Sequence, residues 1–248
     1  MDIQEHRAWL LSLVPLPAGA DVLDLGCGAG DDLRALAERI DGSDARFVGI
    51  DAQEKKIAEA RERTSDPRCD FRVERIESSL PFDDASFDLV LTQEFLECVV
   101  DPAAIVAEIA RVLKPGGLVV ASHYDWDTQT FNASDRERTR RVLQAWADCE
   151  LATMDSADPW MGRRLWGLFS TAGHFEGELH TRVMSNTVFA EPYHGYRMVH
   201  WMKGLPKRGL VSETDYREFC ADVEETAAAG HYFWGVNRYV YVGTRREA

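Results

Sequence analysis

The sequence predicts an α/β protein, in which helices cover both faces of a mostly parallel sheet. Short apolar runs of strand length, such as Val22–Leu25 and Phe47–Asp51, alternate with amphipathic helical patterns. The earlier run leads through the glycine-rich segment Gly26–Gly30 into a helical pattern that begins at Asp32. A strand, a glycine turn and a helix in this order are typical of a nucleotide-type site at the carboxyl end of a parallel strand.

Length and composition are those of one globular domain, which we expect to span residues 1–248. The net charge of −14 argues against nucleic acid and against anionic membrane surfaces as partners. No apolar run approaches the ~20 residues that span a bilayer. The five cysteines are odd in number and share no metal-ligand spacing, so we expect reduced thiols in the cytoplasm and no metal.

The charge around the glycine turn indicates which ligand it binds. Its glycines, Gly26, Gly28 and Gly30, are spaced G-x-G-x-G, whereas a dinucleotide fingerprint is G-x-G-x-x-G. Asp31 and Asp32 stand where a pyrophosphate would approach, and Asp24 precedes the turn. These carboxylates repel a phosphate, and they suit a cationic ligand that carries an ammonium or sulfonium group.

This acidic, three-glycine turn resembles the first motif of the class I S-adenosylmethionine-dependent methyltransferases. The stretch Leu80–Leu91 closely matches the family's lead into strand four, and the resemblance extends over residues 20–125. It implies a Rossmann-like sheet of seven mostly parallel strands in the order 3-2-1-4-5-7-6, in which the last two strands form an antiparallel hairpin. It also implies a cofactor-binding core of about residues 18–125, with residues 126–248 completing the sheet and supplying a helical cap, mainly from 126–160 and 193–230.

The resemblance also implies where the cofactor lies. Asp51, at the tip of the second strand, either accepts hydrogen bonds from the ribose hydroxyls or caps the helix predicted over 53–64, and both roles are compatible. Many relatives place an adenine-binding Asp where this chain has Ile76, so main-chain groups near Ile76 and Glu77 are the expected substitute. The expected cofactor-binding residues are Asp24, Gly26, Cys27, Gly28, Gly30, Asp31, Asp51, Ala52, Ile76, Glu77 and Gln93.

The remaining elements follow from periodicity and capping. We expect helices over residues 2–14, 102–113, 135–151, 160–172 and 212–230, and strands over 71–74, 118–124, 181–189 and 233–242. Capping boxes are predicted at Ser134–Glu137 and Ser212–Asp215, and Pro15 and Pro17 are expected to end the N-terminal helix. That helix either packs on the sheet or covers the cofactor as a flap.

Polar and aromatic side chains near the ends of strands four and five are the candidates for acceptor binding and catalysis. His123 and Tyr124 are the catalytic candidates, although a histidine on a strand is more often structural, and methyl transfer can proceed by positioning alone. Cys98 receives no catalytic role. The predicted acceptor-binding residues are Glu94, Trp126, Trp160, His200 and Trp201, and the cap offers a further polar and aromatic group in Tyr193, His194 and Tyr196.

The sequence therefore predicts an S-adenosylmethionine-dependent methyltransferase, with S-adenosylhomocysteine as product. Its acceptor is predicted to be a small aromatic or amine-bearing molecule of specialised metabolism, methylated on nitrogen, oxygen or carbon. The alternatives are an NAD(P)-dependent oxidoreductase and a non-catalytic cofactor-binding regulator. A homodimer is the candidate assembly.

Overall fold

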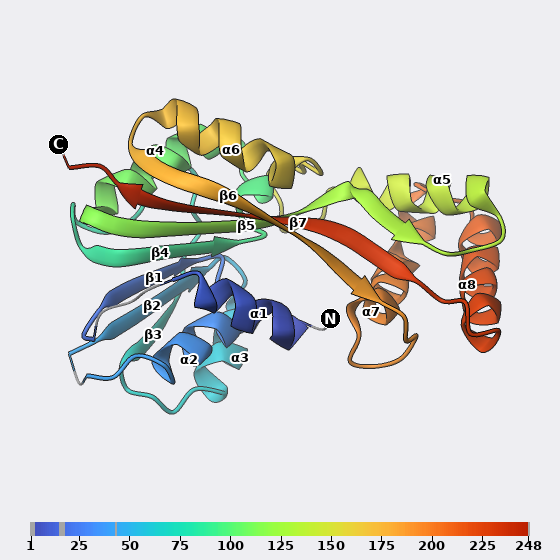
Figure 1. Ribbon diagram of the computed structural model, residues 1–248, viewed down its shortest axis with the longest axis horizontal. Helices are drawn as coiled ribbons and strands as arrows, with labels where there is room; N and C mark the ends of the chain where they lie inside the picture. Colours follow the sequence, from blue (N-terminus) through green and yellow to red (C-terminus); the bar gives the residue numbers. More distant parts are fainter. Residues whose placement is uncertain (1–2, 15–17, 43, 248) are drawn as a thin grey trace.

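A computed structural model describes residues 3–14, 18–42 and 44–247 (Figure 1). Its seven strands form one sheet in the order β3-β2-β1-β4-β5-β7-β6, in which β7 runs antiparallel to both of its neighbours. The strands are β1 (Asp21–Leu25), β2 (Arg46–Asp51), β3 (Cys69–Val73), β4 (Phe87–Gln93), β5 (Leu113–Phe131), β6 (Phe175–Asn186) and β7 (Trp234–Arg245). The predicted fold class and strand order are confirmed.

Eight α-helices and three short 3-10 helices complete the described part of the chain. The α-helices are α1 (Ile3–Ser12), α2 (Asp31–Ala37), α3 (Glu54–Glu62), α4 (Pro102–Val112), α5 (Arg136–Ala147), α6 (Met161–Ala172), α7 (His194–Trp201) and α8 (Glu213–Ala228). The 3-10 helices are η1 (Leu96–Cys98), η2 (Met202–Gly204) and η3 (Pro206–Arg208). None of the described helices is both long and apolar enough to cross a membrane.

Alternate residues of the central strands build two cores, one on each face of the sheet. On one face Val22 packs with buried residues of α1, α2 and α3, whereas on the other Leu23 packs with α4 and α6. This alternation follows from the two-residue period of a strand. Figure 1 shows the same division, with α1 to α3 on one side of the sheet and α4 and α6 on the other.

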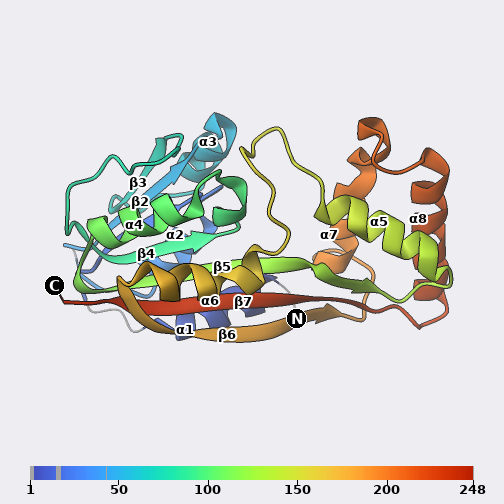
Figure 2. The same cartoon turned by 90° about the horizontal axis from the view of Figure 1, so that it is seen from above.

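Three strands extend far beyond the rest of the sheet and carry a separate group of helices (Figures 1 and 2). β5 and β7 still pair at Thr130 and Gly235, past an irregularity that follows Asp125. These strand ends pack with α5, α7 and α8 around a third apolar cluster, which includes Phe219 and Trp234. We call residues 126–147, 183–205 and 211–237 the helical arm.

Several predicted boundaries were wrong because tertiary pairing extends the strands. β5 is 19 residues long rather than the seven of the predicted strand 118–124, since its partner β7 continues beside it. β6 begins at Phe175 instead of residue 181. α7 was not predicted as a helix, and α6 packs on the core face of the sheet. Pro15 and Pro17 lie outside the described residues.

The predicted capping boxes had different outcomes. At the start of α8, Ser212 accepts a hydrogen bond from the backbone N–H of Asp215 at 3.0 Å, as expected. At α5, however, the capping residue is Asp135, which accepts from the N–H of Arg138 at 2.9 Å. Ser134 instead donates its backbone N–H to the Asp222 carboxylate, which also accepts from the N–H of Asp135. Asp222 thereby ties α8 to the start of α5.

We expect Asp222→Ala to destabilise the protein by about 1–3 kcal/mol, because two backbone N–H groups lose a charged acceptor. Burial opposes ionisation of Asp222, but the N–H groups of Asp135 and Ser134 outweigh it and hold its pKa below the usual value. The stabilisation is therefore full above about pH 4 and declines as pH falls through the lowered pKa. Urea unfolding at pH 7 and pH 3 measures this, and an equal loss at both pH values would contradict it. Glu224→Ala, exposed on the same helix, is the control.

Candidate active site

Two adjoining cavities lie at the carboxyl ends of the parallel strands. The larger has a volume of about 1040 Å³ and extends from the glycine turn to the helical arm, and the smaller has about 260 Å³ and lies over β2. The residues that line both are Gly26, Gly28, Lys56, Gln93 and Glu94. A ligand bound along the turn would therefore extend from one cavity into the other.

The glycine turn presents its backbone directly to these cavities. Gly28 has a φ of 52°, and a Cβ at this position would meet no protein atom within 4 Å, so the space above it is open to a ligand. At Gly26, by contrast, a Cβ would lie 3.0 Å from the Phe95 side chain. The N–H groups of Gly26 and Cys27 donate to the carbonyl of Ile50, which fixes the turn against β2.

Asp51 links the turn to the following helix. One carboxylate oxygen accepts the N–H of Gly28 at 3.0 Å, and the other accepts the N–H of Gln53 at 2.8 Å. The residue lines the smaller cavity. Because each oxygen can accept more than one hydrogen bond, Asp51 can hold the turn and still receive ligand hydroxyl groups. Its predicted contact with ribose stays a prediction that this geometry permits.

The side of the larger cavity nearest the turn is acidic. Asp24 is buried, and burial together with the nearby Asp32 and Asp51 carboxylates raises its pKa well above the usual value, while Arg7 opposes this. Arg7 also binds Asp32, with 2.5 Å between Nε and the carboxylate. A cationic ligand beside Asp24 would favour its charged form.

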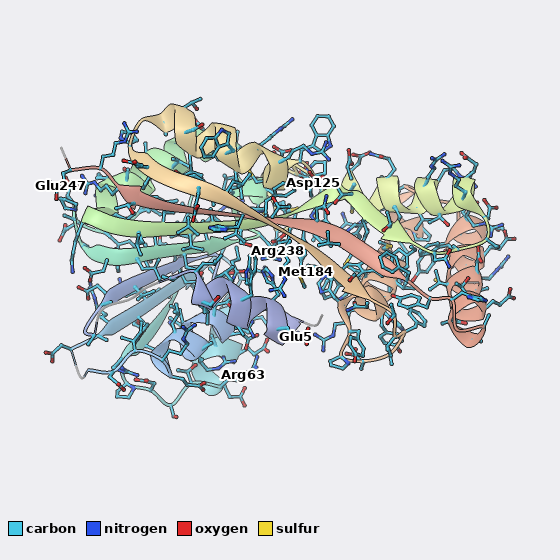
Figure 3. The ribbon with its side chains drawn as sticks, in the orientation of Figure 1. Glu5, Arg63, Asp125, Met184, Arg238 and Glu247 are labelled. Carbon is cyan, nitrogen blue, oxygen red and sulfur yellow. The ribbon has the colours of Figure 1, made fainter. Side chains whose placement is uncertain are left out.

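A buried arginine lies between the turn and the arm. Arg238, on β7, is 4% exposed, and Figure 3 shows it where the sheet continues into the arm. Its guanidinium donates to Ser122 at 2.8 Å and to Gln93 at 2.9 Å, and it lies 3.1 Å from Glu94. It also stacks 4.2 Å from the centre of the Tyr124 ring.

Most residues predicted from the sequence line the two cavities. The predicted residues in the larger cavity are Asp24, Gly26, Cys27, Gly28, Asp31, Gln93, Glu94, Tyr124, Trp126, His200 and Trp201. Asp51, Ala52 and Ile76 line the smaller one. Four others line neither cavity: Gly30, Glu77, His123 and Trp160.

Two of these four were predicted to contact or deprotonate the acceptor. His123 is fully buried, its Nε2 accepts the backbone N–H of Leu96 at 3.2 Å, and burial with Arg238 lowers its pKa to about 3. This arrangement favours a structural role over the predicted base role. Trp160 is 41% exposed and donates its indole N–H to Asp127 outside both cavities, so the geometry gives its predicted acceptor contact no support.

One group among the described residues has the composition of a metal site. Ligand atoms of Glu94, Glu97 and His123 lie within 4.8 Å of one another, and Nδ1 of His123 is 4.0 Å from Glu97. Nε2 of His123 accepts the Leu96 N–H, so the ring proton of the neutral histidine is on Nδ1. A metal at Nδ1 would require the ring to lose that proton. The expectation of no metal rested on cysteine spacing, which could not detect this group.

Sequence reasoning missed several residues that line the larger cavity, among them His6, Arg7, Glu97 and Arg238. Arg238 could have been found from the sequence, because a charged residue interrupts a mainly apolar and aromatic strand pattern there. His6 and Arg7 gave no such signal, because the position of α1 over the site is a tertiary feature.

Comparison with known proteins agrees with this geometry. Residues 16–166, more than half of the chain, match a family model described as a methyltransferase domain. The chain belongs to this methyltransferase family. The predicted family is confirmed, and the match favours it over the nicotinamide oxidoreductase alternative.

Individual relatives differ in what their names say they methylate. A ubiquinone biosynthesis O-methyltransferase from Thiobacillus denitrificans is 38% identical over 125 residues, which are 50% of this chain and 52% of that protein. A Bacillus halodurans protein described as a methyltransferase aligns over 98% of this chain and 100% of its own, with a TM-score of 0.66 and 19% identity. A phosphoethanolamine N-methyltransferase from Haemonchus contortus, crystallised with S-adenosyl-L-methionine, has a TM-score of 0.57 and 17% identity over 98% of this chain and 53% of that one.

The structural likenesses and the sequence relatives support different conclusions. The two structural likenesses concern the fold alone, because their sequence identities are low. The chain spans about half the length, or less, of the curated relatives it matches. The family membership and the fold are therefore established, whereas the acceptor has to be argued from the site.

We expect Gly28→Ala in the methyltransferase domain to weaken binding of S-adenosylhomocysteine by at least about tenfold, because the added methyl group occupies the open space above the turn. Gly116→Ala is the matched control, since Gly116 also has a positive φ, 77°, and open space around its Cβ. Both variants lose about 1 kcal/mol of stability from backbone strain. Isothermal titration calorimetry measures the affinity of both variants for S-adenosylhomocysteine. Unchanged affinity in Gly28→Ala would show that the ligand does not contact this turn.

Proposed function

We propose that the protein is an S-adenosylmethionine-dependent methyltransferase that acts on nitrogen, oxygen or carbon of a small, planar acceptor. The observation that carries this proposal is the pair of adjoining cavities at Gly28, acidic near the turn and aromatic toward the arm. The names of the relatives differ in the atom methylated, so the proposal leaves the atom open.

The residues of the turn fit the cofactor. Asp51 and Gly28 would bind the nucleoside, with Ile76 and Ala52 beside it in the smaller cavity. Asp24 would face the ammonium group of the amino acid part and the sulfonium in the larger one. When bound, S-adenosylmethionine supplies a methyl group on a positively charged sulfur, which is an excellent leaving group.

Aromatic side chains suit the far part of the larger cavity to a flat acceptor. The rings of Tyr124 and Trp126 lie 4.7 Å apart, and Trp146 meets Trp126 edge-on at 6.1 Å. Trp201 lines the same space from α7. Such walls bind planar or cationic molecules through stacking and cation–π contacts.

The protein's own contribution to catalysis is positioning and exclusion of water. The segment 148–160 crosses the site, and its backbone is fixed by hydrogen bonds from Asp155 and Ser156 to the carbonyl of Cys98. Trp126 donates its indole N–H to Glu97 at 3.2 Å, which orients one wall of the cavity. Tyr124 remains the candidate for direct contact with the acceptor. In-line placement in a closed cavity can supply most of the acceleration of a displacement.

We also retain the cytoplasm as the proposed location. Its support is that all five cysteines are free thiols in the structure. A homodimer stays a prediction.

S-adenosylhomocysteine should raise the melting temperature, whereas NAD should not. Ligand at about 100 times its dissociation constant adds roughly 2.7 kcal/mol, or about 5–10 °C for a chain of this size. Differential scanning fluorimetry measures the melting temperature with each ligand. A shift with NAD alone would exclude the methyltransferase proposal.

Asp51→Ala should weaken S-adenosylhomocysteine about ten- to hundredfold, because hydrogen bonds to a charged acceptor are lost. Calorimetry on the folded variant measures the loss, with Asp70→Ala, on the neighbouring strand and outside both cavities, as control. Equal affinities for the variant and the parent would reduce Asp51 to a residue that stabilises the turn.

A screen of small aromatic and amine acceptors with isotopically labelled cofactor tests the reaction itself. The expected product carries one labelled methyl group, detected by its mass. If the cofactor binds but no acceptor in a broad panel is methylated, the non-catalytic regulator becomes the better hypothesis.

A further inference from the structure

Two buried histidines line the larger cavity without any hydrogen-bond partner. His6 is 4% exposed and His194 is 3% exposed, and all four of their ring nitrogens are unpartnered. Neither residue has a role in the site described above. Buried polar atoms in native proteins are almost always paired, so four in one cavity require an explanation.

The two rings reach the cavity from different parts of the fold. His6 lies on α1, with its ring 5.5 Å from that of Trp9. His194 begins α7 in the arm and stacks on Tyr124 at 5.4 Å, with Trp234 at 5.1 Å. In Figure 3, Glu5 marks the end of α1 nearest to Arg238 and Met184, where the arm begins. His194 thus belongs to the arm side of the cavity, and His6 is close enough for the charge of His194 to act on its ring.

Packing alone does not account for histidine at these positions. Phenylalanine would fill the same aromatic surroundings without leaving polar nitrogens unpaired. The ring nitrogens are closed off from solvent in the structure, so a ligand group that enters the cavity would reach them after a small rotation of the rings.

The charges that act most strongly on both rings are positive. Arg238 acts on both, Arg7 and Arg182 act on His6, and Arg197 acts on His194. With burial, they lower the pKa of His6 to about 2 and that of His194 to about 3. Carboxylates pair with three of these arginines: Asp32 with Arg7, Glu94 with Arg238, and Glu191 with Arg197. Arg182 lies over the Trp9 ring at 5.0 Å.

We propose that His6 and His194 bind a carboxylate group of the methyl acceptor, which makes the acceptor an aromatic acid. The proposal rests on the proposed function for the presence of an acceptor in this cavity. Two N–H donors and nearby guanidinium groups suit an anion, and the aromatic walls suit the ring that carries it. The acidic residues beside the glycine turn disfavour the same anion there, so it is directed to the arm side.

The test uses protein saturated with S-adenosylhomocysteine and aromatic acids paired with their neutral amides, starting with 4-hydroxybenzoate and 4-hydroxybenzamide. The parent protein should bind acids more tightly than amides. His6→Phe and His194→Phe should each weaken the acid about ten- to hundredfold, as expected for lost hydrogen bonds to a charged group, and leave the amide unchanged. Calorimetry measures both.

The melting temperature of the same variants distinguishes ligand binding from a structural role, because replacing a structural residue would lower it. Removing the unpaired nitrogens should keep or raise the melting temperature, by up to about 2–4 °C, although acid binding falls. His174→Phe, at an exposed site outside the cavity, is the matched control and should change neither.

Three outcomes would overturn the inference. Acids and amides could bind alike across the panel, or both variants could bind acids as the parent does. In the third, the variants lose affinity for S-adenosylhomocysteine but not for 5′-methylthioadenosine, which lacks the amino acid part. The histidines would then bind the carboxylate of the cofactor and not that of the acceptor. Failure of the parent to bind S-adenosylhomocysteine would instead refute the proposed function, and the inference with it.

Discussion

The buried guanidinium of Arg238 is the interaction on which the site depends. It lies on β7, beside the middle of β5 and the end of β4, where it joins Gln93, Ser122 and Glu94. Gln93 in turn donates to Asp32 at 2.7 Å, at the start of α2. A buried charge is tolerated only where it is paired and hydrogen-bonded, so these partners are held in fixed positions around it. One polar network thereby extends from the start of α2 to the middle of β5 and β7, next to the residues where the arm begins.

The extension of β5, β6 and β7 decides the shape of the site. A sheet that ended with β1 to β4 would leave the carboxyl ends of its strands open to solvent. Here the three longer strands carry the helical arm past that edge, and segment 148–160 returns across the gap (Figure 2). The larger cavity lies between the two parts, so its walls come from both. The enclosure of the cavity therefore follows from the length of these strands.

The sequence predicted the features that local patterns encode. The turn after β1, the acid at the end of β2 and the cap of α8 each depend on residues close together in the chain, so their types and spacing sufficed. The length of β5 and the position of α1 were not predictable in this way, since pairing and packing between distant segments determine them. The same holds for His123: its strand was predicted, but its burial against the backbone of Leu96 depends on η1.

The difference between local and tertiary features affects how the cofactor side and the acceptor side of the site can change. The cofactor side is built from consecutive strand-end segments, in which one altered residue such as Gly28 or Asp51 disturbs the turn itself. The proposed acceptor side takes single residues from separate elements, for example His6 from α1, Trp146 from α5 and His194 from α7. Each can be exchanged without moving the glycine turn. Acceptor choice can therefore vary within the family while the cofactor motif and the central sheet stay the same.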